Sequence, residues 1–297
     1  MPRQRTHFSP YRSTVCATGP GREYVYGVRV APADRHDVPA ALGLLDRTRA
    51  AGGTPAVVIA DRGFSRGRPW LQGLRDRGLM PRFDFTAGQA DRDPDWRGCL
   101  VLQGWPYLPQ LPRRLWRLER PGLHAPAATH TRFHAAVAER AVYALVPHGR
   151  PGPRQARVSS PLFRGRRLGC PTVPGSMRGR DLRYAVCDGA HGPNAGCALR
   201  TGTFTAQYAP LGYQYPIWGT AAWRAGYAQR TAVERGYSLF KNPDVVGMVR
   251  SHFRLRGLVN VTLLSVLGWI AHNLHLRRVA ASPPAPPPRR SRPALAA

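Results

Sequence analysis

Residues 54–63 read TPAVVIADRG, a short apolar run that ends directly on an aspartate and a glycine-containing turn. A continuous apolar run of this length is typical of a strand that is buried on both faces, at the centre of a parallel or mixed sheet. The side chain that follows such a strand points into the crevice where open α/β sheets bind ligands. Asp61 could therefore hold a metal ion there. The alternative is that Asp61 caps the following turn or pairs with Arg62.

The segments on either side of this run alternate between strand and helix patterns. Upstream, Glu23–Ala31 has a period of two and predicts a strand, and Val38–Ala51 has the apolar spacing of a helix. Downstream, Trp70–Gly78 predicts a second helix and Met80–Phe85 a further strand. The alternation of strands and helices within about sixty residues indicates the α/β class.

The rest of the chain divides by composition and pattern. Residues 1–22 are basic, and we expect an irregular arm there. Residues 86–216 contain many Pro, Gly and Arg residues with short alternating stretches, which predicts a β-rich and loop-rich insertion. Helical spacing returns in 217–280, which covers one predicted helix from Trp218 to Lys241 and another from Gly257 to Arg278. Residues 281–297 are rich in Pro and Arg and predict a disordered tail.

The charge of the chain points to a polyanionic partner. Its 297 residues carry a formal charge of +28, from 44 Lys+Arg against 16 Asp+Glu, and such a field attracts phosphate backbones. A GC-rich coding bias toward Arg, Ala, Gly and Pro would explain part of the same excess without any function. The hydrophobic fraction of 43% is sufficient for a folded core and excludes a disordered chain.

Cysteine usage and hydropathy favour a cytoplasmic protein without a membrane partner. The five cysteines and the lack of an apolar signal segment at the N-terminus indicate a reducing compartment. The segment Gly257–Leu276 is apolar, but Asn260, His272, Asn273 and His275 interrupt it. We therefore expect a buried helix there and not a membrane span.

A second chemical signal lies in the stretch 226–241, GYAQRTAVERGYSLFK. On one continuous helix, Tyr227, Arg230, Glu234 and Lys241 would share one face, because they are spaced by three, four and seven residues. Lys241 is the single lysine of the chain. A carboxylate flanked by cations suits a metal ligand whose neighbours bind phosphate groups. The alternative is a solvated helix face with an ordinary Arg–Glu pair.

A group of thiol and imidazole side chains lies in the insertion. Cys170, Cys187, His191 and Cys197 have the chemistry of a tetrahedral Zn²⁺ site, although they lack the usual CxxC spacing. Unpaired structural thiols are the alternative interpretation.

The stretch around Glu234 resembles a known family signature. Tyr227, Arg230, Glu234 and Lys241 match, spacing for spacing, the Y-(2)-R-(3)-E-(6)-K signature of insertion-sequence transposases with a DDE catalytic triad. VVIADRGF around Asp61 is similar to the strand that carries the family's second catalytic aspartate. The flanking sequences YVYGVRVAPADRHDVPAALGLLD and FRLRGLVNVTLLSVLGWIAHNLHL resemble neighbouring elements of the same domain.

This resemblance implies a fold, a chemistry and a partner. The fold would be an RNase H-like mixed sheet flanked by helices, formed by residues 23–85 and 217–280 and interrupted by the insertion. Asp61 and Glu234 would be catalytic and would bind Mg²⁺ or Mn²⁺ for cleavage and strand transfer of DNA. The other signature residues, Tyr227, Arg230 and Lys241, would contact DNA at the transposon ends. Such proteins act in DNA transposition and recombination near the bacterial nucleoid, generally as homo-oligomers.

The sequence departs from the family at the first catalytic aspartate. That residue should precede the Tyr24 strand, yet residues 1–22 contain no Asp or Glu. Asp34 and Asp37 follow the strand and match helix-start positions. We therefore expect a truncated transposase that is inactive alone. Two alternatives are a non-catalytic DNA-binding remnant and an unrelated basic protein with a zinc-stapled module.

Overall fold

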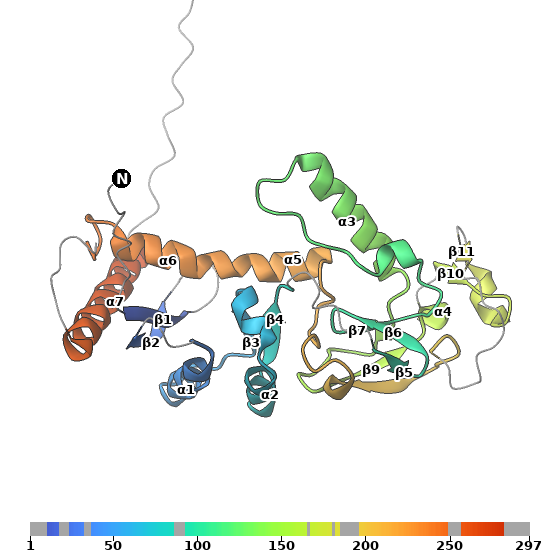
Figure 1. Ribbon diagram of the computed structural model, residues 1–297, viewed down its shortest axis with the longest axis horizontal. Coiled ribbons are helices and arrows are strands. Elements are labelled where there is room, and N and C mark those ends of the chain that lie inside the picture. The colour runs from blue at the N-terminus through green and yellow to red at the C-terminus, as the bar shows by residue number, and fades with distance from the viewer. Residues whose placement is uncertain are drawn as a thin grey trace, which may run out of the picture. The chain divides into compact units, whose positions relative to one another are not determined.

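The computed structural model describes residues 11–17, 24–32, 37–85, 93–164, 167–179, 182–184, 196–248 and 257–281 (Figure 1). These residues belong to two compact units. Unit 1 combines residues 1–35 with 232–297, and unit 2 comprises residues 36–231. The predicted tail lies outside the described residues from Ser282 onward, as does Asp34.

Unit 1 contains a β-hairpin made by β1 (Tyr11–Ala17) and β2 (Val25–Pro32). The two strands pair antiparallel, from Tyr11 opposite Pro32 to Cys16 opposite Gly27. The predicted strand at Glu23–Ala31 is present as β2, shifted by two residues at its start. The prediction of an irregular arm over residues 1–22 is wrong for β1, because the β-branched and aromatic side chains of YRSTVCA favour a strand once a partner strand is available.

Helix α7 (Leu258–Ala281) closes unit 1 against the hairpin. The side-chain amide of Asn273 donates to the Val25 carbonyl at 2.8 Å and accepts from the Val25 amide at 2.9 Å. One asparagine thereby satisfies both backbone groups of a strand residue, as a neighbouring strand would. This contact explains why a polar residue interrupts the apolar sequence of the helix.

The prediction that α7 is a buried helix is wrong for most of its length. Among its residues, Gly268, Trp269 and His272 are buried, and Trp269 stacks on Phe240 of α6 (Thr231–Lys241) with ring centroids 4.3 Å apart. Seven of its large apolar side chains are at least 41% exposed: Leu258, Val259, Leu263, Leu267, Ile270, Leu274 and Val279. Within the described residues, α7 is long and apolar enough to cross a membrane by length and composition alone.

Unit 2 begins with an alternation of helices and strands. Two of the strands pair in parallel, with Val57 opposite Met80 and Ala60 opposite Phe83. The side chains of the first of these strands, Val57–Ala60, are only partly buried, and the sheet has two strands. The expectation of a strand that is buried on both faces at the centre of a sheet is therefore wrong within the described residues. The elements are α1 (Asp37–Ala50), β3 (Val57–Ala60), the 3₁₀ helix η1 (Arg62–Arg66), α2 (Arg68–Asp76) and β4 (Met80–Phe83).

A three-stranded antiparallel meander forms the centre of the larger core. It comprises β5 (Asp93–Trp96), β6 (Cys99–Leu102) and β7 (Trp105–Tyr107). Both connections are two residues long and have positive φ at each position: 56° and 68° at Arg97 and Gly98, then 42° and 82° at Gln103 and Gly104. Such backbone angles belong to type I′ hairpin turns, whose twist matches that of the strands.

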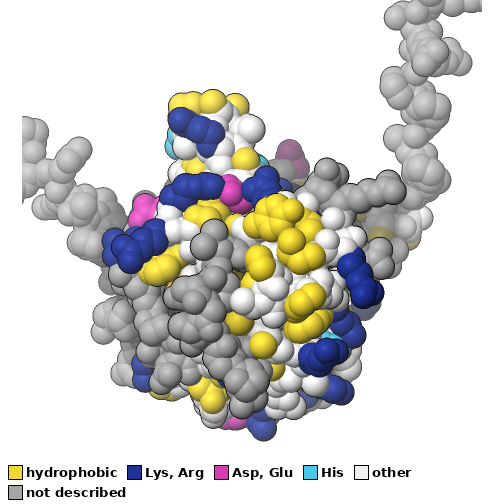
Figure 2. Space-filling model, turned by 90° about the vertical axis from the view of Figure 1, so that its right-hand side faces the viewer, with side chains coloured by type: hydrophobic (Ala, Val, Ile, Leu, Met, Phe, Trp, Pro, Cys, Tyr) yellow, Lys and Arg dark blue, Asp and Glu magenta, His cyan; other side chains and the backbone are white. Residues whose placement is uncertain are grey.

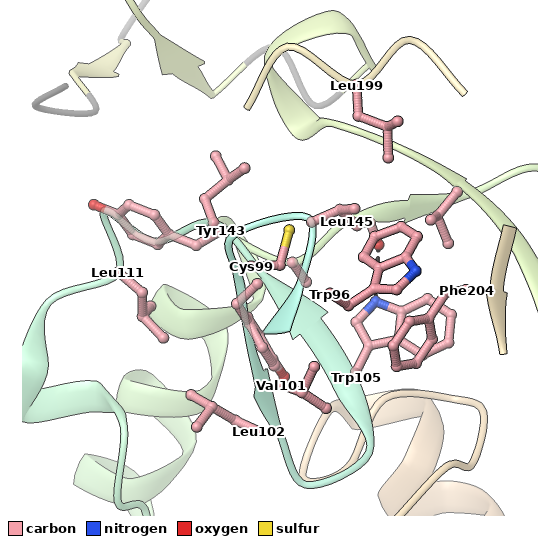
Figure 3. Close-up of a cluster of buried hydrophobic side chains, with 14 of the residues drawn as sticks. Trp96, Cys99, Val101, Leu102, Trp105, Leu111, Tyr143, Leu145, Leu199 and Phe204 are labelled. Carbon is pink, nitrogen blue, oxygen red and sulfur yellow. Dashed lines mark hydrogen bonds between the residues drawn. The ribbon is translucent and has the colours of Figure 1, made fainter. Parts of the chain in front are cut away.

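Large aromatic and aliphatic side chains fill the space against this meander (Figure 3). Trp105 is fully buried, and its indole nitrogen donates to the Leu145 carbonyl at 2.9 Å. Phe204 lies edge-on to Trp96 and Trp105, with ring centroids 5.2 and 6.2 Å away. Since Phe204 lies about a hundred positions beyond these tryptophans, the core joins the two ends of the predicted insertion.

The remaining part of the predicted insertion holds one long helix that the sequence pattern did not predict. Helix α3 (Ala127–Ala141) has fifteen residues and buries Phe133, Val137 and Arg140 on one stripe. Its other apolar side chains are all alanines, so the helical period of large apolar residues is weak in the sequence. The other elements are η2 (Arg113–Leu115), β8 (Val146–Pro147), β9 (Gln155–Ser159), α4 (Pro161–Arg164), β10 (Leu168–Gly169), η3 (Pro174–Arg178), β11 (Arg183–Tyr184), β12 (Gly202–Thr205) and η4 (Ala206–Tyr208).

The predicted continuous helix from Trp218 to Lys241 is interrupted. Helix α5 (Ala221–Tyr227) is followed by the 3₁₀ turn η5 (Ala228–Arg230) before α6 starts at Thr231. The Thr220 hydroxyl caps α5 by accepting from the Trp223 amide at 3.3 Å. The break means that spacing alone does not place Tyr227 and Glu234 on one helical face. As a whole, the described helices and small sheets agree with an α/β class.

Candidate functional site

Asp61 lies directly after β3, at the carboxyl end of the parallel pair that β3 forms with β4. Its side chain is exposed, and Oδ1 accepts a hydrogen bond from the Gly63 amide at 2.9 Å, which caps η1. The capping role considered from the sequence is therefore present. A single oxygen makes this bond, so the carboxylate still has lone pairs that could bind a cation. Arg62, the ion-pair partner considered for Asp61, forms a salt bridge with Asp84.

Asp84 occupies the equivalent position after the neighbouring strand β4. Because Ala60 is opposite Phe83, Asp61 and Asp84 follow the ends of two paired strands. Unlike Asp61, Asp84 is buried, with 1% of its surface exposed. Sequence reasoning missed this residue, although a signal was present: an aspartate follows the strand MPRF just as Asp61 follows VVIA.

Four hydrogen-bond donors and one further salt-bridge contact surround the Asp84 carboxylate. Oδ2 accepts from Nε of Arg62 at 3.0 Å and from Nη1 of Arg120 at 3.1 Å, and Nη2 of Arg62 lies 2.9 Å from the same oxygen in a salt bridge. Oδ1 accepts from the Trp218 indole nitrogen at 2.9 Å and from the Phe85 amide at 3.0 Å. These bonds use the capacity of both oxygens. Asp84 is therefore a paired buried charge and does not replace a missing metal ligand.

Tyr227 lies beside this ion pair, buried in the smaller aromatic cluster of unit 2. Its ring stacks on Trp223 with centroids 4.6 Å apart. The Arg120 and Arg230 guanidinium carbons lie 5.5 and 5.8 Å from the ring centroid, within the range of cation–π contacts. Burial raises the pKa of the Tyr227 hydroxyl, and the Asp84 carboxylate raises it further. The positive charges that oppose this rise belong to Arg230, Arg120 and Arg62.

The other two signature residues belong to unit 1. Glu234 lies in the first turn of α6 and Lys241 ends the same helix, and both are exposed. A carboxylate in the first turn of a helix interacts favourably with the helix dipole, and a lysine in the last turn does the same with the opposite sign. Unit 2 thus holds Asp61, Tyr227 and Arg230, and unit 1 holds Glu234 and Lys241.

The four residues considered for zinc are described only in part. Cys187 and His191 lie outside the described residues. Cys170 and Cys197 are both buried, and the Cys170 sulfur lies 2.9 Å from the Thr172 hydroxyl. Within the described part of the chain, no three His, Cys, Asp or Glu side chains are grouped to hold a metal ion. Zinc binding stays a prediction.

The buried thiol of Cys99 should be unreactive in the folded protein. Cys99 has no exposed surface; burial raises the pKa of its thiol to about 12, and the neighbouring Cys197 adds to the rise. Since the thiolate is the reactive form, iodoacetamide at pH 8 should label Cys99 in denatured protein and leave it unlabelled in native protein, as peptide mass mapping would show. Equal labelling of the two samples would contradict the buried placement of this strand.

Comparison with known proteins supports one family. Residues 3–90 match the transposase DDE domain family. The match includes β3 and Asp61 and ends before the stretch that contains Tyr227 and Glu234. No curated protein and no solved structure matches the chain.

The family match supports a DDE-type transposase and with it a role in transposition. Proteins with this domain act on DNA and use divalent metal ions, typically Mg²⁺. The exposed carboxylate of Asp61 fits such an ion, because Mg²⁺ prefers oxygen ligands and is commonly held by one or two carboxylates together with substrate phosphate.

Proposed function

We propose that this chain is a transposase-like protein of DNA transposition whose Asp61 and Glu234 correspond to the second and third catalytic carboxylates. The observation that carries the proposal is the position of Asp61: exposed, at the carboxyl end of a parallel strand, inside the segment that matches the transposase DDE domain. Tyr227, Arg230 and Lys241 would contact DNA phosphates through their hydroxyl, guanidinium and ammonium groups.

Asp61 and Glu234 would hold Mg²⁺ or Mn²⁺, and the bound ion would supply Lewis-acid activation of a water or 3′-hydroxyl and charge stabilisation at the leaving oxygen. The chemistry of the family uses a third carboxylate, and residues 1–22 of this chain contain neither Asp nor Glu. With two carboxylates the metal ions are incompletely held. We therefore propose that the 297-residue chain by itself binds DNA without cleaving it.

The purified chain should leave supercoiled plasmid intact in Mg²⁺ or Mn²⁺. The measurement is the fraction of nicked plasmid on an agarose gel, with Asp61→Asn and Glu234→Gln as companions. Nicking that both substitutions abolish would overturn the proposed inactivity and would mean that another carboxylate completes the site. Nicking that neither substitution changes would indicate a contaminating nuclease.

A non-catalytic DNA-binding remnant is the second candidate, favoured by the excess of arginine and by the lack of a three-residue metal group within the described residues. Electron paramagnetic resonance of Mn²⁺ in the presence of DNA separates the two. A transposase-like chain should bind Mn²⁺ and lose this binding in Asp61→Asn. A remnant should bind DNA equally well and show no Mn²⁺ binding that depends on Asp61.

A further inference from the structure

The ion pair around Asp84 presents two guanidinium groups next to Asp61. Arg62 directly follows Asp61, and Arg120 comes from the segment between η2 and α3. Both bond to one oxygen of Asp84, so their guanidinium groups lie side by side. The arrangement joins two distant segments at the carboxyl end of β4.

Burial is strongly asymmetric within this group. The Asp84 side chain is 2% exposed, whereas Arg62 and Arg120 are 46% and 37% exposed. Each guanidinium has five N–H donors, and Asp84 accepts one hydrogen bond from Arg62 and one from Arg120. The buried carboxylate therefore fixes the orientation of two partly exposed cations and neutralises one of their two charges.

The aromatic rings restrain Arg120 further. Its guanidinium carbon lies 5.9 Å from the Trp223 ring centroid and 5.5 Å from that of Tyr227. The Trp218 indole nitrogen holds the second oxygen of Asp84 at 2.9 Å. Arginine forks that are fixed in this way lose little conformational entropy when they bind an anion.

We propose that Arg62 and Arg120, held in place by Asp84, form a phosphate-binding clamp for the backbone of a nucleic acid beside Asp61. The paired planar forks fit the oxygens of a phosphodiester and carry no information about base sequence. The clamp rests on the proposed function for the identity of its ligand, and it adds three residues outside the transposase signature. Asp84 is a positioning residue, because its Oδ2 accepts from the arginines and its Oδ1 from Trp218 and Phe85.

The same unit contains a matched control. Glu139 of α3 pairs with Arg114 at 2.6 Å and with Arg183 at 3.1 Å, and these arginines are 63% and 59% exposed. This second group therefore also consists of two exposed arginines on one carboxylate. It belongs to other elements, η2, α3 and β11, and among the described residues it has no aromatic partner of the kind that restrains Arg120.

The test compares the triple variant R62Q/R120Q/D84N with the triple variant R114Q/R183Q/E139Q. Each removes two arginines and one carboxylate, so the net charge changes equally and no buried charge is left without a partner. The D84N substitution also preserves the local packing, because an amide oxygen at this position can still accept from Trp218 and Phe85. Binding of a fluorescein-labelled duplex is followed by anisotropy in EDTA across a series of salt concentrations.

The clamp variant should bind DNA at least about tenfold more weakly than the control, and its slope of log K against log salt should be shallower by about 1–2, since each lost phosphate contact removes about 0.9. Equal affinity and slope in the two variants would overturn the clamp. If the clamp variant does not fold, as judged by tryptophan fluorescence, R62K/R120K is compared with R114K/R183K. The lysine pair keeps the charges and loses the forks, so the first should bind more weakly and an equal affinity would again overturn the proposal.

This assay contains no divalent metal and measures no cleavage. A failure of the clamp therefore leaves the metal-binding and nicking results untouched. Conversely, a chain without Mn²⁺ binding at Asp61 would still show the difference between the two variants if the clamp binds phosphate.

Discussion

The affinity of the chain for duplex DNA should fall by about 10³–10⁵ when the salt concentration rises from 50 to 200 mM, the loss expected for six to ten neutralised phosphates. The formal charge of +28 supplies the cations, and the face shown in Figure 2 carries several basic side chains and few acidic ones. Each phosphate contact releases condensed counterions, and added salt opposes that release. Anisotropy titrations at four salt concentrations measure the slope directly.

A shallow slope, near that of one or two phosphate contacts, would contradict this expectation. It would favour the interpretation that coding bias filled the surface with arginine without any nucleic-acid function. Titration with polyglutamate is the control, because it is a polyanion without phosphate. Binding that prefers DNA over polyglutamate at equal charge would indicate that arginine forks recognise phosphate geometry.

Gly104→Ala should lower the free energy of unfolding of unit 2 by about 2–5 kcal/mol, the sum of left-handed backbone strain and overpacking. Gly104 has φ of 82° in the turn between β6 and β7, and a Cβ there would collide with the Gly212 carbonyl. The atoms nearest to such a Cβ belong to the backbone of Gly212 and Tyr213, so the collision could not be relieved by the movement of a flexible side chain. Guanidinium unfolding followed by tryptophan fluorescence measures the loss, because six of the seven tryptophans belong to unit 2.

Gly98→Ala is the matched control for this substitution. Gly98 occupies the same position of the preceding two-residue turn, with φ of 68°, and a Cβ there would meet no atom within 4 Å. Its cost should be limited to the strain of a left-handed alanine, about 1–2 kcal/mol. Equal losses for the two variants would mean that the close approach of Gly104 to Gly212 does not exist in solution.

The sequence predicted the elements whose periodicity is strong. Val38–Ala51 is present as α1, and the glycines after it end the helix in a Schellman motif: Gly52 has φ of 88° and its amide donates to the Arg49 carbonyl, while the Gly53 amide donates to the Thr48 carbonyl. The run before Asp61 forms β3, and the family match covers it. Helix α3 was not predicted, because its buried stripe includes Arg140. A charged residue is normally expected on the solvent-facing side of a helix, so the sequence did not indicate that this position faces inward.

The arginine clamp could not have been predicted from spacing. Asp84 and Arg120 are 36 positions apart, and Asp84 and Trp218 are 134 apart. Periodicity reports which residues share one element, whereas this group is assembled from the ends of different elements. The position of Asp84 directly after β4 is visible in the sequence, but the burial of this residue and its pairing with Arg62 and Arg120 depend on tertiary packing.

The bond between Asn273 and Val25 has a consequence for the order in which the protein matures on the ribosome. The two residues are 248 positions apart, and the whole of unit 2 is encoded between the two pieces of unit 1. At about 5–20 residues per second, the hairpin waits roughly 12–50 seconds for its helix to be synthesised. Unit 2 can complete its core during that interval. The hairpin, although synthesised before unit 2, is therefore completed after it, and during the wait its unsatisfied strand edge is open to chaperones and to neighbouring nascent chains.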